Sequence, residues 1–211
     1  MADYMRDEDD QAELLKEWWQ KNGTAAIITV VLAVAALIGW REWQGHQGEQ
    51  SSEASKQYQV MVEALTAQQV DEAAVNKQAE ALKDDFPGSA YAGYATLAQA
   101  RLAVQAGEYD KAASLLQDVA DNGATDALTY TARLRLVRVL LQQQAYDKAA
   151  AELDHSFPAA FNGMALELRG DLAKARDDQQ AATEAYTQAL ETLQDNGEKD
   201  RVQMKLDDLK S

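Results

Sequence analysis

The 211-residue sequence contains no cysteine and only two prolines, Pro87 and Pro158. The absence of cysteine excludes disulfide bonds, thiol catalysis and thiolate-bound metals. Few prolines, many alanines and glutamines, and no β-branched run outside residues 24–40 favour helices along the chain. The sequence also lacks a glycine-rich phosphate loop and a Gly-x-Ser-x-Gly motif, so the signatures of two common classes of enzyme are missing.

Basic residues are the minority among the charged ones. The chain carries 20 lysines and arginines against 35 aspartates and glutamates, which gives a net charge of −15. Residues 51–211 alone carry 16 basic and 26 acidic residues, a net charge of −10. Because such a surface repels phosphate groups, we expect no nucleic-acid partner.

One long apolar run is present, and tryptophans flank it on both sides. Residues 24–40 read TAAIITVVLAVAALIGW and carry no charge. Trp18 and Trp19 precede the run, and Trp40 and Trp43 lie at its end and just beyond it. A helix from Trp19 to Trp40 would rise roughly 32 Å, close to the hydrocarbon core of a bilayer. Tryptophan favours the lipid–water boundary, so the two pairs predict the aromatic belts of one transmembrane helix over residues 22–43, in contact with membrane lipid.

A buried core helix and a cleaved secretory signal are the alternatives for this run. No other segment is comparably apolar, the leader is acidic, and no small-x-small cleavage site follows, so an uncleaved signal anchor is favoured. Three basic residues precede the run and two lie in the 20 residues after it, which is a weak bias. We expect residues 1–21 to be a cytoplasmic acidic tail with a short amphipathic helix over residues 12–20, and the long C-terminal part to lie on the other side of the membrane.

Residues suited to catalysis or metal binding are few. His46 and His155 are the only histidines, 109 residues apart. They are more simply a residue near the membrane and a cation at a helix end than a catalytic or metal-binding pair. Adjacent carboxylates at 177–178 and 207–208 are typical of solvated helix ends. We therefore expect no catalytic residue, metal or cofactor; a hydrolase with an unusual carboxylate site is the minor alternative.

Glycines and turn residues divide the chain beyond the span. Gly45 and Gly48 predict a flexible neck over residues 44–51, and Asn22-Gly23 allows a break before the span. Residues 52–211 are expected to form one helical domain with a hydrophobic core. Its helices are expected near 52–68, 71–84, 89–105, 109–120, 125–142, 146–154, 160–175, 179–193 and 198–209, the last of which caps the domain.

A repeat underlies this helical pattern. The copies GEYDKAASLLQDV, QAYDKAAAELDHS and the weaker DDQQAATEAYTQAL begin at Gly107, Gln144 and Asp177. Two antiparallel helices pack closely where small side chains let their backbones approach, and such positions recur at intervals of 37 and 33 residues. These repeat-packing residues are Ala112, Ala149 and Ala182 with, twelve residues earlier in each copy, Ala100, Val137 and Gly170. The pattern predicts an all-α fold, a tetratricopeptide-like α-solenoid of stacked helix pairs, with a generic alanine-rich bundle as the alternative.

In stacked helix pairs the first helices line a concave groove. The residues expected to face this groove are Tyr94, Leu97, Arg101, Leu134, Arg138, Leu141, Met164, Glu167 and Asp171. Aromatic residues and arginine often anchor protein interfaces, so the mixture favours partner binding. The alternative is that these residues are structural or merely exposed.

Several short motifs lie along nearly the whole chain. They are an acidic leader, Asn22-Gly23, Leu37-Ile38-Gly39-Trp40-Arg41, Trp43, His46-Gln47, Leu134-Arg135-Leu136, Leu168-Arg169-Gly170-Asp171 and Gln203-Met204-Lys205-Leu206-Asp207-Asp208-Leu209. With them the chain resembles the ancillary subunits of the bacterial SecYEG translocon. The resemblance implies a single-pass inner-membrane protein of Gram-negative bacteria whose repeat domain is periplasmic.

The resemblance also implies partners. These are the SecYEG translocon, a membrane-anchored periplasmic chaperone of the prolyl-isomerase type, and a cytoplasmic response regulator that the acidic tail would contact. The expected function is that of a non-enzymatic adaptor that links protein export to periplasmic chaperones. A scaffold for cell-envelope construction or division, built on the same anchor and repeats, is the alternative.

Overall fold

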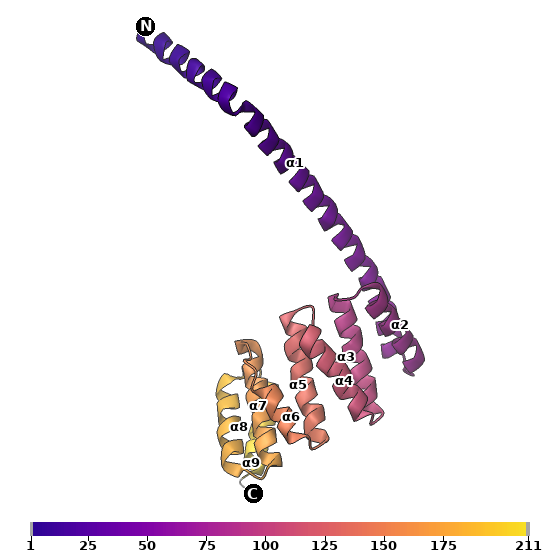
Figure 1. Cartoon of the computed structure of the whole chain (residues 1–211). Helices are drawn as coiled ribbons and strands as arrows, with labels where there is room; N and C mark the ends of the chain where they lie inside the picture. Colours follow the sequence, from indigo (N-terminus) through magenta and orange to yellow (C-terminus); the bar gives the residue numbers. More distant parts are fainter. Residues whose placement is uncertain (1, 210–211) are drawn as a thin grey trace. The chain divides into compact units, whose positions relative to one another are not determined.

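The computed structural model describes the backbone of residues 2–209 and the side chains of residues 16–25 and 27–209. Within this part of the chain all regular secondary structure is α-helical, as Figure 1 shows. The helices are α1 (Ala2–Thr66), α2 (Glu72–Asp85), α3 (Ala90–Gln105), α4 (Tyr109–Asn122), α5 (Asp126–Gln142), α6 (Tyr146–Leu153), α7 (Ala159–Ala175), α8 (Gln179–Thr192) and α9 (Asn196–Asp208). The predicted all-α fold is confirmed.

The chain divides into two compact units, residues 1–52 and residues 53–211. The first unit consists of the long N-terminal part of α1, and the second contains the end of α1 together with α2 to α9. We call the second unit the repeat domain.

The structure corrects two expectations about α1, which is uninterrupted both at Asn22-Gly23 and at the predicted neck, residues 44–51. A glycine within a helix costs only about 1 kcal/mol relative to alanine, too little to end a long helix. Asn22 donates its side-chain amide to the carbonyl oxygen of Trp18 at 3.1 Å, a bond that is compatible with the helix. The amphipathic helix predicted for residues 12–20 is part of α1, and its side chains before residue 16 lie outside the described residues.

The repeat domain is a row of packed antiparallel helix pairs. Helices α3 and α4 form one pair, α5 and α6 the next, and α7 and α8 the third, while α9 packs on α8. The first helices of successive pairs also meet, because α3 contacts α5 and α5 contacts α7. This arrangement is the predicted tetratricopeptide-like solenoid.

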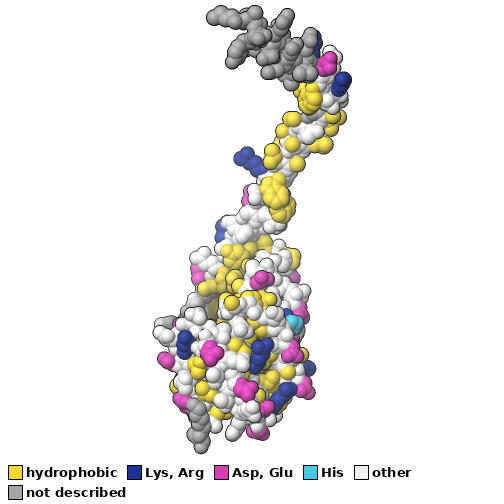
Figure 2. Space-filling model, turned by 90° about the vertical axis from the view of Figure 1, so that its left-hand side faces the viewer, with side chains coloured by type: hydrophobic (Ala, Val, Ile, Leu, Met, Phe, Trp, Pro, Cys, Tyr) yellow, Lys and Arg dark blue, Asp and Glu magenta, His cyan; other side chains and the backbone are white. Residues whose placement is uncertain are grey.

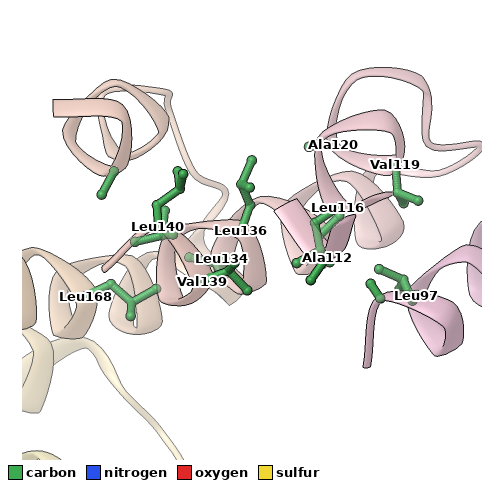
Figure 3. Close-up of a cluster of buried hydrophobic side chains, with 14 of the residues drawn as sticks. Leu97, Ala112, Leu116, Val119, Ala120, Leu134, Leu136, Val139, Leu140 and Leu168 are labelled. Carbon is green, nitrogen blue, oxygen red and sulfur yellow. The ribbon is translucent and has the colours of Figure 1, made fainter. Parts of the chain in front are cut away.

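Three hydrophobic clusters hold the row together. The largest runs from α3 to α7, and Figure 3 shows several of its leucines pointing into the space between helices. Leu136 and Leu168 in this cluster are each 1% exposed, and full burial of a leucine stabilises a fold by about 1.5–3 kcal/mol. A second cluster joins the end of α1 to α2 and α3, and a third joins α7, α8 and α9. Each helix pair thus shares its apolar faces with its neighbours.

The turn inside each helix pair is the same. Gly107, Gln144 and Asp177 all adopt a left-handed backbone, with φ of 76°, 59° and 60°. In each turn the amide of the following residue donates to the carbonyl five positions earlier, at 2.8, 2.8 and 2.9 Å. Left-handed backbone costs an L-residue about 1–2 kcal/mol, so the hydrogen bonds and the packing impose this turn on Gln144 and Asp177. The weak third copy therefore has the geometry of the first two.

All six repeat-packing residues are buried where paired helices cross. Ala112, Ala149 and Ala182 are inaccessible to solvent, as is Val137, and Ala100 is 1% exposed. Gly170 is buried against Tyr186, and a Cβ added at Gly170 would overlap the tyrosine ring. The third pair therefore uses glycine because a large aromatic ring fills the space that alanine or valine fills in the other pairs.

Candidate membrane helix and partner-binding groove

The apolar part of α1 is long enough to cross a membrane by length and composition, and its most apolar stretch, as far as its side chains are described, is not buried. Ile28, Leu32 and Leu37 are 54%, 65% and 68% exposed. Figure 2 shows hydrophobic side chains along this helix. The hydroxyl of Thr29 donates to the carbonyl oxygen of Ala25 at 2.9 Å, so this polar group in the middle of the helix is satisfied without water. A buried core helix, one of the two alternatives, does not fit this exposure.

The four tryptophans form two pairs on α1, with the two rings of each pair tilted against one another. The ring centroids of Trp18 and Trp19 are 6.3 Å apart, and those of Trp40 and Trp43 are 5.2 Å apart. Each of the four side chains is at least half exposed. Rings that are exposed at both ends of an apolar helix suit the two interfaces of a bilayer.

The predicted groove residues separate into three groups. Tyr94, Arg101 and Arg138 are exposed, and Leu97 is largely buried but lines a hollow between α3 and α5. Leu134 is 2% exposed and belongs to the largest core cluster. Its assignment to the groove is corrected, because α5 is packed against four neighbouring helices and little of its circumference stays open.

The third repeat does not contribute an open groove. Met164 is partly buried against the core, as is Leu141 of the second repeat, and Glu167 and Asp171 are held by α9. Glu167 is 2% exposed and accepts hydrogen bonds from Arg201 Nε at 2.9 Å, Arg201 Nη2 at 2.7 Å and Lys205 Nζ at 2.7 Å. Glu167 was expected to face a partner, and it faces α9 instead.

Charge stabilises this contact between α7 and α9. Burial on its own would raise the pKa of Glu167, but the hydrogen bonds from Arg201 and Lys205 outweigh burial and lower it to about 2. Asp171 accepts from Lys205 at 2.7 Å and from the Tyr186 hydroxyl at 2.8 Å. Burial and the bond to Asp171 raise the pKa of Tyr186, which therefore remains a neutral donor. The cluster closes the concave side of the third repeat.

An open groove remains at the first two repeats. Two adjoining hollows of about 290 and about 310 Å³ share Leu97, Arg101 and Arg135 as lining residues. The first extends to Val139 and Arg138, and the second to Tyr58, Leu65 and Tyr94. We call this surface the arginine groove; it is lined by Tyr58, Tyr94, Leu97, Arg101, Arg135 and Arg138.

Two of these residues were missed by sequence reasoning. Arg135 is one position from Leu134, a rotation of about 100° around a helix, so a one-residue error in register exchanged a groove residue for a core residue. Tyr58 lies on the last turns of α1, in a pair whose repeat signature is lost. The centroid of its ring lies 5.9 Å from that of Tyr94. Burial raises the pKa of Tyr58, and the nearby Tyr94 raises it further. The tilted tyrosines make one wall of the groove.

The described residues hold no cluster of three or more histidine, cysteine or acidic side chains arranged for a metal ion. His46 interacts with Gln50, with 3.2 Å between their Nε2 atoms.

Comparison with known proteins places this architecture in a family. Residues 16–211 match the family described as "Tetratricopeptide repeat-like domain". An ancillary SecYEG translocon subunit of Haemophilus influenzae is 32% identical over 189 residues, which cover 90% of this chain and 91% of that protein. The chain belongs to the family of ancillary SecYEG translocon subunits.

Two further members of this family align over almost the full length. The protein of that name from Neisseria gonorrhoeae is 32% identical over 97% of this chain and 98% of its own length. The one from Escherichia coli K12 is 31% identical over 96% of each chain. No solved structure matches the chain. The match begins within α1, so the apolar helix and the repeat domain both belong to the shared family pattern.

Proposed function

We propose that the chain is a single-pass adaptor of the bacterial inner membrane. The apolar run of α1 crosses the bilayer, with residues 1–21 in the cytoplasm and the repeat domain in the periplasm. The repeat domain associates with the SecYEG translocon and holds a membrane-anchored periplasmic chaperone of the prolyl-isomerase type. The observation that carries this proposal is the joint presence of an exposed apolar helix and an open groove in a chain whose relatives are named ancillary translocon subunits.

The physical benefit of such an adaptor is effective concentration. Two proteins tethered to one membrane complex meet as if each were present at high local concentration, so a weak contact suffices to keep a chaperone near emerging chains. A groove of modest volume fits this role better than a large permanent interface does.

Co-purification of the tagged full-length chain in mild detergent tests the proposal. We expect translocon subunits and a membrane-anchored chaperone to be recovered together. Recovery of neither contradicts the proposal, and recovery of the translocon without the chaperone leaves a translocon subunit that is not an adaptor. A fluorescent fusion found in a mid-cell ring, and not around the whole cell rim, would favour the division scaffold.

The orientation can be tested cleanly because the chain has no cysteine. Single cysteines introduced as Gln20→Cys and Gln188→Cys lie at exposed positions on α1 and α8. A membrane-impermeant maleimide added to spheroplasts should label Gln188→Cys, whereas Gln20→Cys should react only after lysis. The opposite labelling pattern would reverse the proposed topology.

A further inference from the structure

The arginines of the repeat domain differ in whether a protein group binds them. Arg133, Arg169, Arg176 and Arg201 each donate hydrogen bonds to a carboxylate or a backbone carbonyl at 3.2 Å or less. The remaining three arginines of residues 53–211 are those of the arginine groove. Among the described residues, none accepts a hydrogen bond from or forms an ion pair with Arg101, Arg135 or Arg138.

These three charges are close together and line the same hollow. Within the described part of the chain, no aspartate or glutamate lines either hollow of the groove. Burial against the groove walls lowers the pKa of Arg135, and the positive charges of Arg138 and Arg101 lower it further. Like charges held together without a counterion destabilise the chain alone, and an incoming anion would relieve this repulsion.

The third repeat shows how this chain fills the matching position. Counted by the repeat intervals of 37 and 33 residues, Arg101, Arg138 and Asp171 are equivalent. Asp171 has the opposite sign, and it is bound by Lys205 of α9 at 2.7 Å. In the third repeat, the acidic residue at this position thus binds a basic segment of the same chain. In the first two repeats the equivalent residues are positively charged, and no acidic segment of the described chain binds them.

We propose that the arginine groove binds a partner segment that carries two or more carboxylates beside an apolar side chain. The carboxylates pair with the guanidinium groups of α3 and α5, and the apolar side chain packs on Leu97 and the tyrosines. Charge complementarity favours a narrow segment over an anionic membrane surface. The rest of the domain carries an excess of acidic residues that would repel a broad anionic surface but would not meet a segment within the groove.

This inference deepens the proposed function by naming the chemistry of the partner segment, and it can be tested without the translocon. The purified full-length chain in uncharged detergent is titrated into a short fluorescent peptide of glutamate, alanine and one leucine. A second peptide has glutamine in place of each glutamate. Fluorescence anisotropy reports binding, and empty micelles correct for partition of the peptide into detergent.

The variants are matched in charge. Arg101→Gln, Arg135→Gln and Arg138→Gln are combined in one chain. The control combines Lys77→Gln, Lys148→Gln and Lys174→Gln, which are exposed positions away from the groove. Each variant loses three positive charges, so any difference in peptide binding between the two arises from the groove. Arg135→Gln alone serves if the triple arginine variant fails to fold.

The expected result is a specific loss. The glutamate peptide should bind about tenfold or more weakly to the arginine variant, because hydrogen bonds between charged groups are stronger than neutral ones. The glutamine peptide should bind weakly and equally to the native chain, the arginine variant and the lysine control. Added salt should weaken the binding of the glutamate peptide only. If the arginine variant binds the glutamate peptide normally while co-purification succeeds, this inference fails and the adaptor function stands. If co-purification fails while the arginine variant loses peptide binding, the adaptor function fails and the groove chemistry stands.

Four results would overturn the inference. Equal affinity for the two peptides would make the groove an apolar docking site. An equal loss in the lysine control would reduce the effect to net charge. Displacement of the peptide by nanodiscs rich in anionic lipid, but not by zwitterionic ones, would assign the arginines to a membrane surface. Self-association that the arginine substitutions abolish would assign the groove to a second copy of the chain.

Discussion

Replacing Glu167 with glutamine tests whether a cluster of charges fixes α9 to the rest of the repeat domain. Glu167 is 2% exposed, and Arg201 and Lys205 of α9 donate to its two carboxylate oxygens at 2.7–2.9 Å. Glutamine keeps the shape of the side chain but removes its charge and turns one acceptor into a donor. The substitution therefore leaves two cations of α9 facing a neutral group.

The size of the effect follows from the pKa of Glu167. A fall from 4.5 to about 2 on folding corresponds to about 3 kcal/mol of stabilisation at neutral pH. Removing one partner of a buried ion pair costs about 3–5 kcal/mol in other proteins, which agrees with this figure. For a domain of this size the loss should lower the midpoint of thermal unfolding by roughly 6–12 °C.

The dependence of stability on pH has a definite sign. The folded-state pKa is lower than that of the unfolded chain, so the stabilisation is complete at pH values above 4.5. It is lost progressively as the pH falls from there through the folded value of about 2. Glu167→Gln should therefore be less stable than the native chain at neutral pH, and the difference should shrink on acidification through this range.

Thermal unfolding of the full-length chain in mild detergent, followed by far-ultraviolet circular dichroism, measures both effects. Hydrogen exchange at the amides of α9 locates the change, and those amides should exchange faster in Glu167→Gln. The matched control is Glu191→Gln, an exposed carboxylate on α8. If Glu167→Gln differs from this control by less than about 0.5 kcal/mol at neutral pH, the charge cluster does not stabilise the domain as argued.

The remaining predictions concern packing and the membrane helix. Gly170→Ala should cost about 1–3 kcal/mol, because the new methyl group overlaps the ring of Tyr186, and thermal unfolding should show it; an unchanged midpoint would mean that the ring moves freely. Gly45→Ala and Gly48→Ala should each stabilise α1 by about 0.5–1 kcal/mol, because nothing lies within 4 Å of the added carbon; slower amide exchange over residues 44–51 would show it, and a flexible neck would show no change. Leu32→Arg should cost about 3 kcal/mol of insertion, and carbonate extraction should release more of it than of the native chain; equal retention would refute the span assignment.

Most of the fold could be predicted because its causes are local in the sequence. The left-handed turns at Gly107 and Gln144 each lie two residues before a Tyr-Asp-Lys-Ala-Ala signature. This shared signature is enough to predict two helix pairs. The third pair was harder to recognise, because its copy lacks the Tyr-Asp-Lys-Ala-Ala signature although its turn has the same geometry. The continuity of α1 was missed because a glycine indicates where a helix is weakened, and the neighbouring residues decide whether it ends.

The groove was harder to predict than the fold because it depends on register to within one residue. Arg101 and Arg138 follow from the repeat interval, but Leu134 and Arg135 point in directions about 100° apart, and only packing decides which is buried. Glu167 was misassigned for a different reason. Its partners Arg201 and Lys205 lie 34 and 38 residues away, on the capping helix, and no pattern in the sequence specifies which side chains of α7 that helix meets.

The closed third repeat and the open first two repeats share one design. Asp171 of α7 carries a negative charge, and α9 supplies the basic side chain of Lys205, which covers it. The equivalent residues of α3 and α5 carry positive charges, and nothing in the described part of the chain covers them. Three residues separate α9 from the end of α8, and α9 packs on α8, so it lies at the C-terminal end of the row. The sign change leaves the arginine groove open to a segment from outside the domain, and it selects that segment by charge.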